Sequence, residues 1–124
     1  MKKSVQVAFG VLAVSLGFAF GAGTAMAQDV AAVAPKNVKV LVDNDRVRIL
    51  EVLDKPGEKE PMHSHPNYVT VGLSTTRIRV TTPDGKAVEK DRKYGDAVYG
   101  GPVTHTTENI GTGDFHVIVI ELKK

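Results

Sequence analysis

Short runs of alternating apolar and polar residues make up most of the chain, and glycine, proline, asparagine and aspartate separate the runs. In the run 77–81, isoleucine and valine alternate with arginine and threonine. A period of two residues is the pattern of a β-strand that buries one face. We therefore expect strands at 38–42, 46–53, 68–71, 77–81, 87–93, 97–99, 103–107 and 115–122.

The segments between these runs contain residues that favour turns. The pair Asp84-Gly85 is a hairpin signal, and Pro56-Gly57 marks another turn. No stretch after residue 36 has the apolar spacing and the capping residues of a helix. The pattern predicts an all-β domain of eight or nine short strands, built as a sandwich or a barrel.

The first 27 residues have the features of a secretory signal peptide. Two lysines are followed by an apolar run over 7–20, and small residues lead to Ala25-Met26-Ala27, a cleavage signal of the A-x-A type. The alternative, an uncleaved membrane anchor, is disfavoured because the run is short for a membrane span. We expect cleavage after Ala27, export to the periplasm or the medium, a linker or N-terminal arm over 28–36, and one domain over 37–124.

Removal of residues 1–27 changes the charge of the chain. The whole sequence has a formal net charge of +2, and the two basic residues of the signal segment account for it. A neutral mature chain has no electrostatic basis for binding nucleic acid or an anionic membrane. The chain also lacks cysteine, which excludes disulfides, thiolate metal sites and thiol nucleophiles.

Candidate chemistry is concentrated at three histidines. His63 and His65 are one residue apart, so in an extended strand their side chains point to the same face. His105 belongs to a later hairpin and can converge on them from across a sheet. Three imidazoles that meet inside a small β-fold would form a metal site.

The sequence around these histidines resembles the cupin superfamily. Gly57, five further residues and His63-Ser-His65 match the first family motif, while Gly95, the bend at 100–102, His105 and Asn109 resemble the second. The glutamate of the first motif is absent, because its position holds Val69 or Thr70. The resemblance covers residues 38–124.

The resemblance implies a double-stranded β-helix, the jelly-roll barrel of cupins, with a divalent metal held by His63, His65 and His105. Imidazole ligands suit iron, zinc, manganese, nickel and copper alike. A site of three histidines without the glutamate is similar to that of the thiol dioxygenase branch. Glu60, Asp96 and Glu108 are acids that can supply an oxygen ligand, but none stands at a matched position.

Other side chains are weaker candidates. Tyr68 and Tyr99 flank the histidine segments and are expected mainly to pack, with ligand contact through the hydroxyl as the alternative. His116 matches no motif and is expected to be a surface histidine or a strand histidine with its own hydrogen-bond partner, not a ligand. Arg77 and Arg79 are expected on a solvated sheet face; if they faced the barrel interior instead, they would suit a carboxylate ligand.

Three functions are compatible with the sequence. The first is a metalloenzyme that acts on a small organic molecule, an oxygenase or an isomerase. The second is a non-catalytic module that binds a small molecule or a metal, and the third is a dimerising scaffold with a degenerate site. A mature chain of about 97 residues is small for one core, so we expect a homodimer formed through an edge strand or the N-terminal arm.

Overall fold

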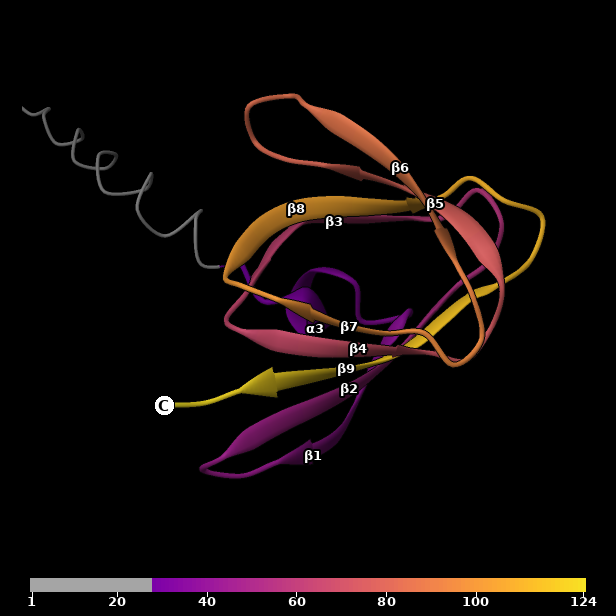
Figure 1. Cartoon of the computed structure of the whole chain (residues 1–124). Helices are drawn as coiled ribbons and strands as arrows, with labels where there is room; N and C mark the ends of the chain where they lie inside the picture. Colours follow the sequence, from indigo (N-terminus) through magenta and orange to yellow (C-terminus); the bar gives the residue numbers. More distant parts are fainter. Residues whose placement is uncertain (1–27) are drawn as a thin grey trace, which may run out of the picture.

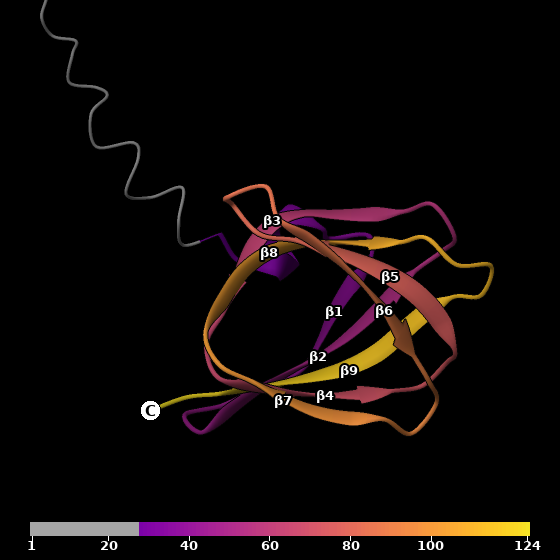
Figure 2. The ribbon, with the colours of Figure 1, turned by 45° about the horizontal axis from the view of Figure 1, so that its top comes forward.

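Two antiparallel β-sheets face each other and enclose the interior of the protein (Figures 1 and 2). The structure is a computed structural model that describes residues 28–124. The signal peptide predicted over 1–27 and its cleavage point lie outside the described residues. The elements are α3 (Val30–Val33), β1 (Val38–Asp43), β2 (Val47–Asp54), β3 (Lys59–His65), β4 (Tyr68–Gly72), β5 (Thr76–Thr81), β6 (Ala87–Arg92), β7 (Ala97–Gly100), β8 (Val103–Asn109) and β9 (Phe115–Leu122).

The strand order gives the barrel its form. One sheet has the order β1-β2-β9-β4-β7 and the other the order β3-β8-β5-β6. Strands distant in sequence are neighbours in both sheets, as in a double-stranded β-helix. The predicted all-β class is confirmed, and each predicted strand lies within two residues of an observed one. Within the described part of the chain, no helix is long and apolar enough to cross a membrane.

The side chains that fill the barrel come from alternate positions. On β9, Phe115, Val117 and Val119 are buried and the residues between them are half-buried. Leu50 of β2 lies beside Val119 in the register and is fully buried. Because the same alternation continues to the end of β9, it also buries Glu121 and brings a carboxylate into the interior.

The segment 28–36 differs from the expected linker or loosely docked arm. Val30–Val33 forms one helical turn, and the Asp29 side chain accepts a hydrogen bond from the backbone N–H of Ala31. Val30 is fully buried in the core. Ser64 of β3 donates its backbone N–H to the carbonyl of Gln28 at 2.8 Å. A helix of four residues is too short to show an apolar period, so no pattern in this segment predicted it.

Asn109 fixes the turn that connects β8 and β9. This side chain is fully buried and takes part in four hydrogen bonds. Its Oδ1 accepts from the Thr76 hydroxyl and from the backbone N–H of Gly111, while its Nδ2 donates to the carbonyls of Asp54 and Gly113. The asparagine of the second motif therefore joins β2, β5 and the turn in one place.

Candidate metal centre

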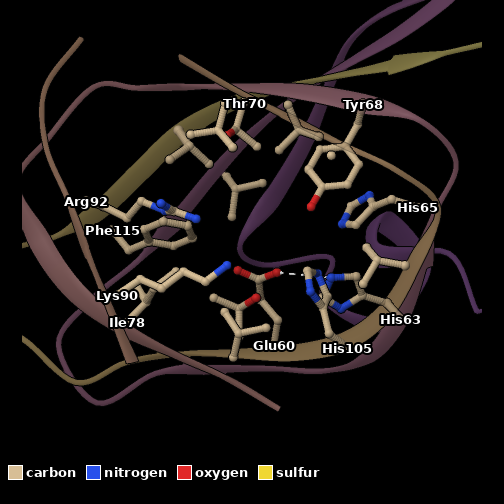
Figure 3. Close-up of a pocket in the computed structure, with 18 of the residues that line it drawn as sticks. Glu60, His63, His65, Tyr68, Thr70, Ile78, Lys90, Arg92, His105 and Phe115 are labelled. Carbon is tan, nitrogen blue, oxygen red and sulfur yellow. Dashed lines mark ion pairs between the residues drawn. The ribbon is translucent and has the colours of Figure 1, made fainter. Parts of the chain in front are cut away.

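The three predicted histidines lie together at one end of the interior (Figure 3). His63 of β3 and His105 of β8 are paired across the two strands, and His65 lies two residues further along the same face of β3. One ring nitrogen from each lies within 4.8 Å of the other two. His63 and His65 are buried and His105 is half-buried. The spacing of two residues on β3 produces the first part of this arrangement, as the sequence predicts. His105 joins it through the long-range pairing of β8 with β3, not through the expected hairpin, because β7 and β9 lie in the other sheet.

Hydrogen bonds fix the proton position on two of the rings. His63 Nδ1 lies 2.7 Å from the carbonyl oxygen of Pro61, which only accepts, so Nδ1 carries the proton. His65 Nδ1 lies 2.6 Å from a carboxylate oxygen of Glu121 and donates to it in the same way. In both rings Nε2 is left with a free lone pair, and among the described residues the buried Nε2 of His63 has no hydrogen-bond partner. This is the protonation pattern that metal-binding histidines require.

A chain of charged groups supports His65 from behind. Glu121 accepts a hydrogen bond of 2.9 Å from Arg48 Nε, and the two Nη atoms of Arg48 donate to the carboxylate of Asp29 at 3.0 and 2.6 Å. Burial acts to raise the pKa of Glu121, but the hydrogen bonds from His65 and Arg48 outweigh it and lower that pKa. Glu121 is thus ionised at neutral pH and holds the imidazole in one orientation.

Burial keeps His63 and His105 neutral. It is the main cause that lowers the pKa of His63 to about 4 and the pKa of His105 to about 3. The neighbouring histidines add to the effect on both. Since a metal ion competes with protons for these nitrogens, neutral imidazoles at pH 7 favour metal binding.

The same shifts predict how the metal-free protein responds to acid. Below pH 6.5 the unfolded chain protonates these histidines and the folded chain does not, so their contribution to stability is complete above pH 6.5 and is lost as the pH falls toward 4. We expect a loss of about 3 kcal/mol per histidine between pH 7.5 and 4, measured by urea unfolding in the presence of a chelator.

Substitution of His105 by glutamine separates this effect from that of other groups. The raised pKa values of Asp54 and Glu60 act in the opposite sense, because they favour the folded state as the pH falls. His105→Gln should therefore have a shallower loss of stability in acid than the wild type. If the free energy of unfolding fell equally steeply with pH in both proteins, His105 would not be a source of the acid sensitivity.

An acid absent from the family motif lies next to the histidines. Glu60 Oε1 is 3.6 Å from His63 Nε2, and the side chain is buried. A β-bulge explains its position, because Glu60 pairs with Thr107 and His63 with His105, so two residues of β3 stand opposite one of β8. The bulge turns Glu60 and His63, three residues apart, to the same side.

Glu60 is a carboxyl group that holds a proton readily. Burial, together with the neighbouring carboxyl of Asp54, raises its pKa well above the usual value. Two buried carboxyl groups in contact cannot both ionise easily, so the pair retains a proton. Of the other candidate acids, Glu108 pairs with Arg79 at 3.1 Å and Asp96 accepts from the backbone of Lys93 in a turn. No carboxylate occupies position 69 or 70, and Thr70 lines the cavity there.

The histidines open into a cavity of about 460 Å³, a size suited to a small organic molecule. Tyr68 and Tyr99 both line it. The Tyr68 ring lies 5.2 Å from that of His65, whereas Tyr99 is 64% exposed. His116 is half-buried, lies outside the cavity and contacts Glu51 through Nε2 at 2.7 Å.

Comparison with solved structures identifies the class of the fold. A cupin domain from Bordetella pertussis Tohama I is 29% identical, with a TM-score of 0.65 over 70% of this chain and 92% of that one. An RmlC-like cupin family protein with a double-stranded β-helix fold from Methanocaldococcus jannaschii is 23% identical, with a TM-score of 0.56 over 69% of this chain and 78% of that one. The protein is therefore a double-stranded β-helix, and it belongs to the cupin superfamily.

The fold also occurs in a known enzyme. A structure of oxalate decarboxylase is 23% identical, with a TM-score of 0.55 over 69% of this chain, but the match spans only 25% of that enzyme. At this identity the similarity shows the fold alone. No protein-family model matches the sequence, and none of the curated proteins searched matches it.

The residues present fit a divalent transition metal. Three imidazoles converge, two of them have Nδ1 hydrogen-bonded, and the buried Nε2 of His63 has no hydrogen-bond partner among the described residues. The set contains no sulfur ligand. Such donors suit the metals expected from the sequence and do not select one of them.

Proposed function

We propose that the protein is an exported, metal-dependent enzyme that acts on a small organic molecule as an oxygenase. One observation carries the proposal: three imidazoles with converging nitrogens lie at the end of a cavity of about 460 Å³. Three protein ligands leave coordination positions open for water or substrate, which is the arrangement of a catalytic rather than a structural metal site.

The residues around the histidines have distinct parts in this function. His63, His65 and His105 would hold the ion, and the Pro61 carbonyl and Glu121 orient two of them. The bound metal would supply Lewis-acid or redox chemistry at its open positions. Glu60 lies beside His63 and is suited to give or take a proton at its carboxyl oxygen. The apolar walls of the cavity exclude bulk water from the reacting groups.

A second candidate function is a non-catalytic module that binds a small molecule or a metal. It is favoured by the absence of a carboxylate at positions 69 and 70. A site with one fewer negative charge binds divalent ions less tightly. An isomerase would share the bound metal with the oxygenase, but its reaction would not consume oxygen.

Location and assembly complete the proposal. We place the mature protein, from Gln28 onward, in the periplasm or outside the cell, on the evidence of the sequence pattern over 1–27. We also propose a homodimer. The edge strand β1 exposes Val40, Leu41 and Val42 at 39–45%, and the N-terminal segment is packed on its own chain, so the strand is the better candidate for the contact.

The metal content of the purified protein tests the central claim. Prepared without chelator, the protein should contain about one metal ion per chain by mass spectrometry, and reloading the stripped protein should raise its melting temperature. His63→Ala and His105→Ala should lose both properties, whereas His116→Ala, which removes a histidine outside the cavity, should keep them.

The outcome also separates the candidate functions. Bound iron would favour the oxygenase, and zinc or manganese would favour the isomerase or the binding module. Failure of the reloaded wild type to retain any metal would reject the metalloenzyme, as would full metal content in His63→Ala and His105→Ala.

A further inference from the structure

We propose that the cavity binds an organic anion, a small carboxylate with an apolar body, and that Lys90 and Arg92 hold its carboxylate group. The placing of the other end of this molecule at the histidines rests on the proposed function. The anion-binding end rests on separate observations on β5 and β6.

The charges on β5 and β6 are divided between the two faces of the sheet. On the outer face, Arg77 pairs with Asp91 at 2.6 Å, and Arg79 pairs with Glu89 and Glu108 at 3.1 Å. This outer position of the arginines is the one expected from the alternation of β5. The outer face is thus balanced in charge, and its acids are occupied by partners on that face.

The inner face of the same strands carries positive charge without such partners. Lys90 is paired with Ile78 and Arg92 with Thr76 in the register, and both cations line the cavity (Figure 3). Within residues 28–124, neither cation has a carboxylate within ion-pair distance. The sequence shows the division in 87–92, where acids and bases alternate and all the acids fall on the outer side.

The side chains of Lys90 and Arg92 both extend into the cavity. Figure 3 shows them entering it on the side opposite the three histidines. They line the same cavity as Tyr68 and His105. A ligand that reaches from the histidines across the cavity would therefore meet both cations at its far end.

The remainder of the cavity defines the body of the ligand. Its walls include Ile78, Val80, Phe115, Val117 and Val119, so most of the surface offered to a ligand is apolar. Lys90 and Arg92 are two residues apart on one strand face, about 7 Å along β6, and two cations at this spacing can engage one carboxylate together. An anion with a short apolar chain or ring satisfies both parts of the cavity.

Binding of matched acids and amides to the metal-free protein tests the anion site by itself. The probes are phenylacetate, 3-phenylpropionate and 4-phenylbutyrate, each compared by calorimetry with its own amide. Without metal the carboxylate cannot coordinate an ion, so a preference for the acid reports on the cations. At least one acid should bind about tenfold more tightly than its amide. High salt should weaken this preference, because one of the cations is largely exposed.

Variants assign the preference to its residues. The double variant Lys90→Met with Arg92→Met should bind the acid and the amide about equally. Lys39→Met, which removes an exposed charge on β1, should keep the wild-type preference. The zinc-induced rise in melting temperature should persist in the double variant, since its histidines are intact; this checks that the variant is folded.

Each result decides between the two proposals. If no acid is preferred over its amide, or if the double variant keeps the preference, the anion site is wrong, whatever the zinc result. If the acid is preferred but zinc does not bind the wild type, the anion site stands and the metalloenzyme is rejected.

Discussion

Asn109→Ala is expected to destabilise the protein by about 4 kcal/mol, enough to leave a domain of this size only marginally folded. The side chain is fully buried and its four hydrogen bonds join β2, β5 and the β8–β9 turn. Truncation would take the side-chain partner from the Asp54 carbonyl and from the Gly111 N–H and would open a cavity, while the Thr76 hydroxyl would keep its second bond, to the Gly113 carbonyl at 3.1 Å. A buried polar group that loses its partner destabilises the folded state by more than the net free energy that its hydrogen bond contributed.

Urea unfolding measured by circular dichroism checks this result. Asn109→Asp keeps the shape and loses the two N–H donors, so it should fall between the wild type and Asn109→Ala. Asn67→Ala is the matched control, because Asn67 is half-buried and only its backbone carbonyl is used, by Leu122. A loss below about 1 kcal/mol for Asn109→Ala would show that the turn is held by other contacts.

Arg48→Met is expected to cost about 3 kcal/mol and to weaken metal binding as well. Arg48 is the common partner of Asp29 and Glu121, and its side chain is only 18% exposed. Its removal leaves the carboxylate of Glu121, 5% exposed, with His65 as its remaining partner among the described residues. The pKa of Glu121 would rise, and its hold on the His65 ring would weaken.

Two measurements separate the parts of this prediction. Urea unfolding gives the stability, and competition with a chelator gives the zinc affinity, which we expect to fall by about tenfold. Arg46→Met removes an exposed arginine two residues away and should leave both values unchanged. Equal zinc affinity in Arg48→Met and the wild type would mean that Glu121 orients His65 without help from Arg48.

The fold was predictable because local patterns determine most of it. The period of two located every strand of the described residues except β3, which lies between Pro56 and Pro66, and the residues Asp84-Gly85 located the hairpin between β5 and β6, where Gly85 has a φ of 87°. His63 and His65 followed from the same period. His105 followed from the motif that resembles the second cupin motif, not from any local property.

The supporting residues could not be predicted because they depend on register and on irregular backbone. Arg48 and Glu121 are 73 residues apart, and only the pairing of β2 with β9 places them side by side. Glu60 has the opposite parity to His63, so a regular strand would have turned it outward, and the bulge alone brings it in. The alternation of acids and bases on β6 indicated that its cations share one face, but only the pairing with β5 shows that this face is turned to the interior.

The packing of Gln28, Asp29 and α3 against the barrel determines where a fusion partner can be attached to the chain. The backbone carbonyl of Gln28 accepts from Ser64, which lies between His63 and His65, and Asp29 continues the contact through Arg48. A purification tag or partner domain joined ahead of Gln28 would therefore be attached within two residues of the support for His65. At the other end of the fold, Leu122, Lys123 and Lys124 are exposed, so a partner joined after Lys124 would be separated from Glu121 by three exposed residues.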